Sequence, residues 1–351
     1  MKLACLSVAL LLLCGAAGAQ TNSYSVSPIV NNTQDPYLVN PWGLSRPVSP
    51  NKPENEWWTS DNATGYSTLY YANKLGAQSL APLVITIPSA NGTGTGSPTG
   101  TAYNPAVGPG PGAENFTFAT LDGTISNWNA TQRPSPAGSG CYQCHVSNAT
   151  VMVNHSSSGA SYTGLAIATN ATTHAPTYYA ANNNGGVEAY DATTFKQLPA
   201  SGKFADPTIP SGYKPYGIQA FGSVIVVTFF NGTSGGYVDA FDTNGNLKGR
   251  VAHGNWMSEP WGMALAPANF GIFSNMLLVG NTTSGWIAAF DTKTGAFKGF
   301  LNDSTGKPIT IPGLWGISFG NGNPESGPTN TLYYAAGGNY MTGVFGAITP
   351  N

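Results

Sequence analysis

The sequence predicts an all-β protein, a six-bladed β-propeller, from two series of short phrases that alternate along 351 residues. In the first series, a glycine followed by a small or aliphatic residue closes a four-residue phrase six times, at 41–44, 98–101, 162–165, 215–218, 260–263 and 314–317. In the second series, a turn glycine precedes a large apolar residue by five positions: Gly65 and Tyr70, Gly123 and Trp128, Gly185 and Tyr190, Gly236 and Phe241, Gly285 and Phe290, Gly343 and Ile348. Recurrence at a fixed order indicates one structural unit used six times.

Each unit is expected to hold four antiparallel strands. Stretches such as 56–60, 116–120 and 224–230 are short and rich in β-branched and aromatic residues, as strands are. One strand lies at the glycine phrase, a second before the turn glycine, a third carries the large apolar residue, and a fourth follows, as at 82–87. Hairpin chemistry at 191–194, 242–245 and 291–295 joins the third strand to the fourth. After the leader, Gly, Pro or Asn interrupts every window that could form an amphipathic helix, so almost no helix is expected.

The sixth unit ends after its third strand, near Thr349. The N-terminal stretch 24–30 has the composition of a strand and is expected to supply the missing fourth one. That pairing would close the ring and remove an exposed sheet edge.

The pattern resembles NHL-type six-bladed β-propellers, whose blades open with a Pro-x-Gly-apolar strand and carry an apolar-Phe-Asp-x-x-Gly hairpin. The phrases at 40–44, 122–128 and 313–320 look more closely like a family of secreted, functionally uncharacterised propellers of bacteria and some eukaryotes. The resemblance covers nearly the whole mature chain. It implies the fold and brings no established activity with it.

The N-terminus has the features of a secretory signal peptide over residues 1–19. Lys2 precedes an apolar run from Leu3 to Leu13, and small residues at 17–19 form a cleavage site before Gln20. The run is shorter than the roughly 20 apolar residues of a membrane span, and Leu13 stands before Cys14 where a lipoprotein would carry a small residue. We expect a secreted protein, extracellular or periplasmic, with no membrane anchor. Residues 20–351 would form a single propeller domain with loop insertions near 89–112 and 131–147.

The chain carries little charge. Only 8% of its residues are charged, with 13 basic and 15 acidic side chains. This composition excludes nucleic acid as a partner. Few titrating carboxylates also predict a stability that depends weakly on pH in acid.

The sharpest local motif is the sequence Cys-Tyr-Gln-Cys-His at 141–145. Cys141 and Cys144 have the spacing that forms thioethers to haem, and His145 would then bind the iron, so a covalent haem c is one prediction. A sixth ligand would come from Met152, His155, His174 or solvent. The other prediction is a Cys141–Cys144 disulfide, which an exported chain forms readily. A metal thiolate site is a third alternative, for which further ligands are lacking.

Asn-x-Ser/Thr triplets, the acceptors of N-linked glycans, are numerous. Such a triplet also makes a good turn, so each one has a structural reading beside glycosylation. The eleven candidate sites begin at Asn31, Asn62, Asn91, Asn115, Asn129, Asn148, Asn154, Asn170, Asn231, Asn281 and Asn302.

The central channel is the third candidate, because six-bladed lactonases hold a metal there with carboxylate and amide oxygens. Asp61, Asp122 and Glu259 are the metal candidates, together with the amides of Asn40 and Asn182. Turn formation and strand capping explain the same residues. The Trp residues at 57, 58, 261 and 315 recur at equivalent blade positions, which favours packing between blades over ligand stacking.

From these features we expect a secreted propeller that acts as a binding or structural, self-assembling protein, with no reaction assigned. Its neutral surface, rich in Asn, Thr and Gly, favours carbohydrate, matrix or further copies of itself as partners. A homo-oligomer or filament would follow from self-association. The alternatives are a c-type haem protein in electron transfer and a metal-dependent, lactonase-like hydrolase.

Overall fold

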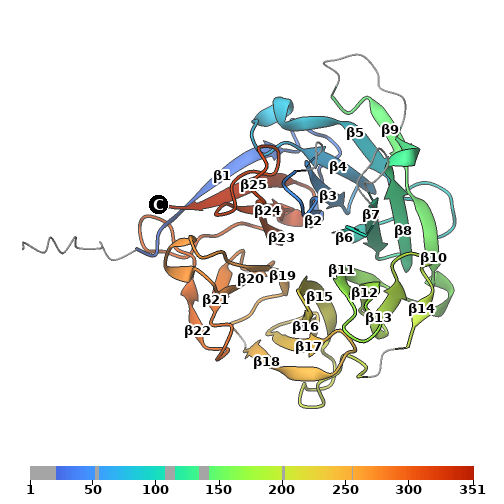
Figure 1. Ribbon diagram of the computed structural model, residues 1–351. Helices are drawn as coiled ribbons and strands as arrows, with labels where there is room; N and C mark the ends of the chain where they lie inside the picture. Colours follow the sequence, from blue (N-terminus) through green and yellow to red (C-terminus); the bar gives the residue numbers. More distant parts are fainter. Residues whose placement is uncertain (1–20, 52–54, 107–114, 134–141, 200–201, 255) are drawn as a thin grey trace, which may run out of the picture.

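The computed structural model describes residues 21–51, 55–106, 115–133, 142–199, 202–254 and 256–351. Six sheets, each built on four antiparallel strands, stand around a common axis, and Figure 1 shows this ring. The predicted six-bladed propeller is therefore confirmed. The leader 1–19 lies outside the described residues. Within the described ranges no helix is both long and apolar enough to cross a membrane.

The strands follow the predicted order within each blade, from the channel outwards. Blade 1 holds β2 (Pro41–Ser45), β3 (Trp57–Asp61), β4 (Tyr66–Tyr70) and β5 (Leu80–Thr86); blade 2 holds β6 (Pro98–Tyr103), β7 (Asn115–Thr120), β8 (Thr124–Asn129) and β10 (Thr150–Asn154); blade 3 holds β11 (Tyr162–Thr169), β12 (Pro176–Asn182), β13 (Gly186–Asp191) and β14 (Gln197–Leu198).

The second half of the ring repeats this arrangement. Blade 4 holds β15 (Lys214–Phe221), β16 (Val224–Phe230), β17 (Tyr237–Asp242) and β18 (Leu247–His253); blade 5 holds β19 (Pro260–Leu265), β20 (Leu277–Asn281), β21 (Ile287–Phe290) and β22 (Phe297–Phe300); blade 6 holds β23 (Leu314–Phe319), β24 (Leu332–Ala336), β25 (Val344–Pro350) and β1 (Tyr24–Asn31). Helix is confined to five 3₁₀ turns in the described ranges: η1 (Gly76–Ser79), η2 (Ala130–Gln132), η3 (Ser156–Ser158), η4 (Gly271–Phe273) and η5 (Gly338–Tyr340).

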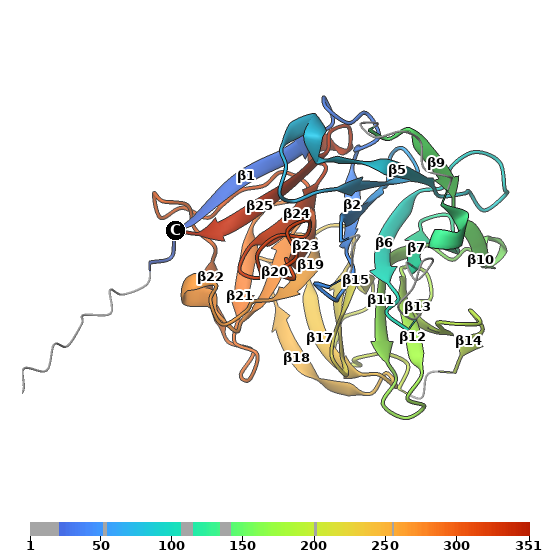
Figure 2. The same ribbon diagram turned by 45° about the horizontal axis from the view of Figure 1, so that its top comes forward.

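The ring closes as the sequence predicts, with the N-terminal strand completing the last blade. β1 pairs antiparallel with β25, in a register that runs from Tyr24 opposite Pro350 to Asn31 opposite Val344. Figure 2 shows β1 along the outer edge of β25. The two ends of the chain therefore hold one sheet together, and the edge of β25 is covered.

One strand was not expected. β9 (His145–Asn148) lies in the insertion between the third and fourth strands of blade 2, but it pairs in parallel with β5 of blade 1. Blade 1 thus becomes a five-stranded sheet whose outermost strand comes from its neighbour's loop.

The six phrase glycines let the first strands approach one another closely around the axis. A Cβ built on Gly262 would lie 2.1 Å from the carbonyl oxygen of Trp315 in the next blade, and one on Gly217 would lie 2.2 Å from that of Trp261. The contact that closes the circle, from Gly316 to the Trp42 carbonyl, would be 2.6 Å. Cβ atoms do not come this near to backbone, so glycine is required for the approach.

Large aromatic residues fill the spaces between blades. Trp58 of blade 1 stacks on Phe116 of blade 2, with ring centroids 3.8 Å apart. On the other side of the same sheet, Trp57 packs against Tyr333 and Phe345 of blade 6. Both indoles are fully buried. The adjacent pair Trp57–Trp58 therefore connects blade 1 to both of its neighbours, because successive strand residues face opposite ways.

We predict that Gly262→Ala destabilises the protein by roughly 1–3 kcal/mol, because its methyl group would overlap the backbone of blade 6. Gly164→Ala is the matched control, since its Cβ would lie 3.1 Å from the nearest atom. Urea unfolding followed by circular dichroism measures both variants. Equal stabilities for the two alanine variants would contradict a steric role for the glycine ring.

Candidate functional site

The loop with the predicted haem or disulfide motif is attached to blade 1. Gln143 donates a side-chain hydrogen bond to the Asp35 carboxylate at 2.5 Å, and its backbone N–H donates to the Ala81 carbonyl. His145 begins β9, opposite Leu83. Cys144 is disulfide-bonded, whereas Cys141 lies outside the described residues. The pairing of these two cysteines stays a prediction.

Two of the channel candidates occupy equivalent, strained positions. Asn40 and Glu259 each precede the proline that opens a first strand, and both have left-handed backbones, with φ of 50° and 60°. This conformation is costly for residues other than glycine and persists only where the surroundings enforce it. In blade 6, Gly313 takes the same position, with φ of 67°.

The side chains of these two residues make contacts between blades. Glu259 accepts hydrogen bonds from the hydroxyls of Tyr216 (2.7 Å) and Thr283 (2.8 Å), one on each carboxylate oxygen. The pKa of Tyr216 is raised by burial and by the negative charge of Glu259. Asn40 accepts from the Trp315 indole at 3.0 Å. Both residues therefore use their oxygens to connect neighbouring blades.

Three tryptophans from first strands close the channel beside these residues. The rings of Trp42 and Trp315 stack with centroids 3.7 Å apart, and Trp261 meets both edge-on at 6.1 and 5.9 Å. The cavity that remains among the first-strand glycines has a volume of about 30 Å³. A cavity of this size holds about one water molecule.

The other channel candidates lie in separate blades. Asp122 accepts from the backbone N–H of Ser97 at 3.0 Å in a hairpin turn, and Asn182 donates to Glu188 at 2.7 Å in blade 3. Asp61 is fully buried in blade 1. No group of three or more His, Cys, Asp and Glu residues in the described ranges could hold a metal ion. The structure thus does not bring Asp61, Asp122 and Glu259 together.

Asp61 belongs to a buried network with a second carboxyl group, Asp35. Asp61 accepts from the hydroxyl of Thr68 at 2.7 Å, Thr68 shares a 2.6 Å hydrogen bond with Tyr70, and Tyr70 donates to Asp35 at 2.5 Å. Burial raises the pKa of Asp61 well above its usual value, and the charge of Asp35 raises it further. Burial also raises the pKa of Asp35. In blade 4, burial raises the pKa of Asp239 to about 6, although Arg250 opposes the shift.

These shifts alter the expected response to pH. A carboxyl group whose folded pKa is raised stabilises the protein fully below its unfolded pKa, near 4, and this stabilisation is lost as pH rises through the folded pKa. The weak pH dependence expected from composition stays a prediction for acid, and these buried carboxyls are expected to add a dependence at higher pH.

We predict that stability falls as pH rises above about 4, with a slope of up to about 1.4 kcal/mol per pH unit for each raised carboxyl. Asp61→Asn should flatten this decline, because the amide carries no charge at any pH. Thermal unfolding between pH 4 and 8 measures the effect. The control is Asp303→Asn, which changes an exposed carboxylate. Hydrogen bonds from Thr305 lower the pKa of Asp303, so the decline in stability should persist in this variant. A decline of equal slope in the Asp61→Asn variant would contradict the assignment.

The sequence analysis does not predict a polar cluster that lies between blades 2 and 3. The Tyr162 hydroxyl donates to Glu188 at 2.8 Å and lies 3.0 Å from Nδ1 of His155, one of the possible haem ligands. Tyr190 also donates to Glu188. Burial acts to raise the pKa of Glu188, but hydrogen bonds from Tyr190, Asn182 and Tyr162 outweigh it and lower the pKa. The cluster holds an ionised carboxylate in place between two blades.

Several of the glycan acceptor triplets form turns in the fold. In six of them the asparagine side-chain oxygen accepts the backbone N–H two residues later, at 2.9–3.1 Å: Asn31, Asn91, Asn129, Asn154, Asn170 and Asn231. Asn170 and Asn281 are only 8% and 1% exposed, and their amide nitrogens donate inward. Asn91, Asn148 and Asn154 are exposed. Glycosylation stays a prediction, with those three as the most accessible acceptors.

A further feature that the sequence analysis does not predict is the seam between blades 4 and 5. Two recesses of about 510 and 420 Å³ lie there and share Arg250, Val251 and Gly295 in their walls. The smaller recess has an aromatic shelf formed by Trp256 and Phe297, which are 39% and 47% exposed and have ring centroids 5.0 Å apart. No spacing in the sequence joins these residues, because they come from different blades.

No family model matches the chain. The uncharacterised proteins R640 and L690 of Acanthamoeba polyphaga mimivirus are 29% and 28% identical to it, over 66% and 90% of its length. The aligned regions make up 42% of R640 and 81% of L690. These relatives bring no function with them.

Solved structures with a similar fold include sugar dehydrogenases. A glucose dehydrogenase is 11% identical with a TM-score of 0.57, covering 92% of this chain and 99% of its own. The PQQ-bound aldose sugar dehydrogenase of Streptomyces coelicolor is 12% identical with a TM-score of 0.56, covering 94% and 100%. Such low identities support the propeller fold alone. The resemblance to NHL-type and secreted propellers stays a prediction.

Proposed function

We propose that the protein is a secreted binding propeller, with no reaction assigned, that holds its ligand on the outer wall of the ring, at the seam between blades 4 and 5. The observation that carries this proposal is the exposed aromatic shelf of Trp256 and Phe297 beside an open recess. Exposed, clustered aromatic side chains commonly mark binding surfaces.

Carbohydrate is the partner class that the shelf suits best. The flat indole of Trp256 is held in place by Phe290 and Phe300 behind it, at centroid distances of 5.8 and 6.0 Å. An ordered aromatic face of this kind stacks on the apolar face of a sugar ring at little entropic cost. His253 lies in the same recess as a polar neighbour. A matrix polysaccharide would be bound in this way.

The geometry favours the binding function over both alternatives. A lactonase-like site requires access to the channel, which the stacked Trp42 and Trp315 close, and both oxygens of Glu259 already accept hydrogen bonds. The predicted Cys141–Cys144 disulfide competes with a haem thioether, because both would use the Cys144 sulfur. Self-association through the exposed shelf is a further form of the same binding function.

We predict that Trp256→Ala weakens binding to a polysaccharide by at least about tenfold, because the stacking surface is lost. Affinity electrophoresis against a panel of neutral and acidic polysaccharides measures this effect. Tyr142→Ala is the matched control, since Tyr142 is an exposed aromatic residue of the blade 2 insertion. If the unaltered protein binds none of the polysaccharides in the panel, the carbohydrate proposal is refuted.

The secreted form tests the predicted processing. We predict that its intact mass, after enzymatic removal of N-linked glycans, corresponds to a chain that begins at Gln20 and lacks two hydrogens, as a Cys141–Cys144 disulfide requires. Reduction should restore those two hydrogens. A mass greater by one haem would instead assign Cys141, Cys144 and His145 to a haem c, and a mass that includes residues 1–19 would rule out the signal peptide.

A further inference from the structure

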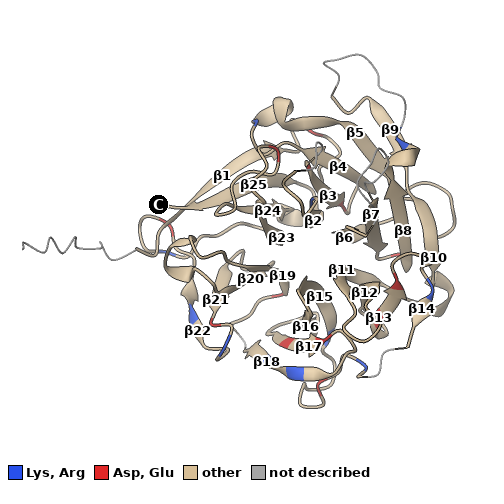
Figure 3. Cartoon of the chain, in the orientation of Figure 1, with Lys and Arg blue, Asp and Glu red and all other residues tan. Residues whose placement is uncertain are grey.

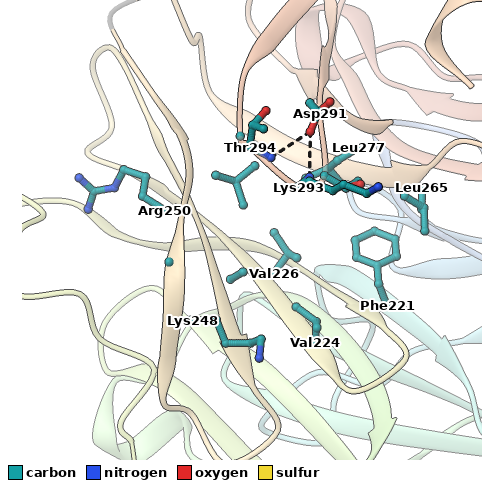
Figure 4. Close-up of a pocket in the computed structure, with 15 residues that line it drawn as sticks. Phe221, Val224, Val226, Lys248, Arg250, Leu265, Leu277, Asp291, Lys293 and Thr294 are labelled. Atoms are coloured by element: carbon teal, nitrogen blue, oxygen red, sulfur yellow. Dashed lines mark hydrogen bonds between the residues drawn. The ribbon is translucent and has the colours of Figure 1, made fainter. Parts of the chain in front are cut away.

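The larger recess at the seam is an apolar groove. It lies between β16–β18 of blade 4 and β19–β20 of blade 5, and the turn at 291–295 forms its rim. Figure 4 shows the apolar side chains directed into one space. Those that line it are Phe221, Val224, Val226, Val251, Leu265 and Leu277. The volume of about 510 Å³ is typical of sites for small molecules.

Positive charge gathers at the rim of this groove. Three of the chain's 13 Lys and Arg residues, namely Lys248, Arg250 and Lys293, line it. Figure 3 marks basic residues on β18 and β22 in blue. Arg250 is engaged by Asp206 at 2.5 Å and by Asp239 at 3.0 Å. Within the described part of the chain, neither lysine forms an ion pair.

The one acidic group at the rim is compensated. Asp291 accepts hydrogen bonds from the backbone N–H groups of Lys293 and Thr294, each at 2.9 Å, as Figure 4 shows. It also lies 3.9 Å from the ammonium of Lys298. Lys248 and Lys293 are therefore the cationic side chains at the rim that form no ion pair in the described ranges, although the charge of Lys248 also acts on Asp242.

We propose that this groove binds an anionic amphiphile, a straight aliphatic chain with a carboxylate head, with the chain on the apolar walls and the head at the lysine rim. Apolar burial supplies affinity in proportion to chain length, and the lysines select the sign of the head group. A polysaccharide does not match the aliphatic walls. This inference rests on the seam being the binding surface, but it concerns the groove and not the aromatic shelf.

The test uses dodecanoate as the probe and isothermal titration calorimetry on the full secreted chain. We expect one binding site, with affinity rising roughly tenfold for each two carbons from octanoate to dodecanoate. The double variant Lys248→Gln/Lys293→Gln should bind dodecanoate roughly tenfold more weakly. The matched control Lys196→Gln/Lys214→Gln changes two exposed lysines outside the groove and should bind as the unaltered protein does.

Two further measurements separate the charge from the cavity. Ala240→Phe fills the groove from β17 and should abolish binding while the protein melts as the unaltered protein does. Dodecyltrimethylammonium, with the same chain and the opposite charge, should not bind. No binding of dodecanoate, or equal binding by both lysine variants or by both head groups, would overturn the proposal. If Trp256→Ala loses polysaccharide binding but still binds dodecanoate, the aromatic shelf and the groove are separate binding sites.

Discussion

The rest of the molecule depends on how closely the six first strands approach one another around the axis. Each phrase glycine places its Cα against the backbone of the next blade, and the series returns from Gly316 to Trp42. This spacing fixes where the second, third and fourth strands stand, and hence how wide the space between blades is at each radius. Near the axis, the first strands leave a cavity with room for about one water molecule. At the periphery, the space between blades 4 and 5 opens into the grooves of the seam.

The fold could be predicted because its constraints are local and repeated. A turn glycine and the aromatic residue five positions later lie in one hairpin, so the sequence carries both within a short window. β9 shows the limit of this reasoning. Its four residues pair with β5 because the insertion turns back over blade 1, where Gln143 meets Asp35. A contact across 108 residues leaves no periodic trace in the sequence.

The candidate sites were less predictable for the same reason. Asn40 and Glu259 were correctly placed near the ends of first strands, but only the structure shows that Tyr216, Thr283 and Trp315 occupy their oxygens. The residues of the seam come from two blades and several strands, and each is unremarkable in its own segment. The buried carboxyls show what composition does not reveal. The chain has few acidic residues, but Asp35 and Asp61 are both fully buried, and burial shifts the pKa of a carboxyl group.

The stacked indoles of Trp42 and Trp315 join the first blade to the last across 273 residues of sequence. Their contact requires the first strands of blades 1 and 6 to meet, which happens when the ring closes. The pair is therefore a built-in optical reporter of closure: its exciton coupling and fluorescence quenching arise when the ring shuts and vanish when it opens. Folding of individual blades and completion of the ring can accordingly be followed as separate events in the unmodified protein.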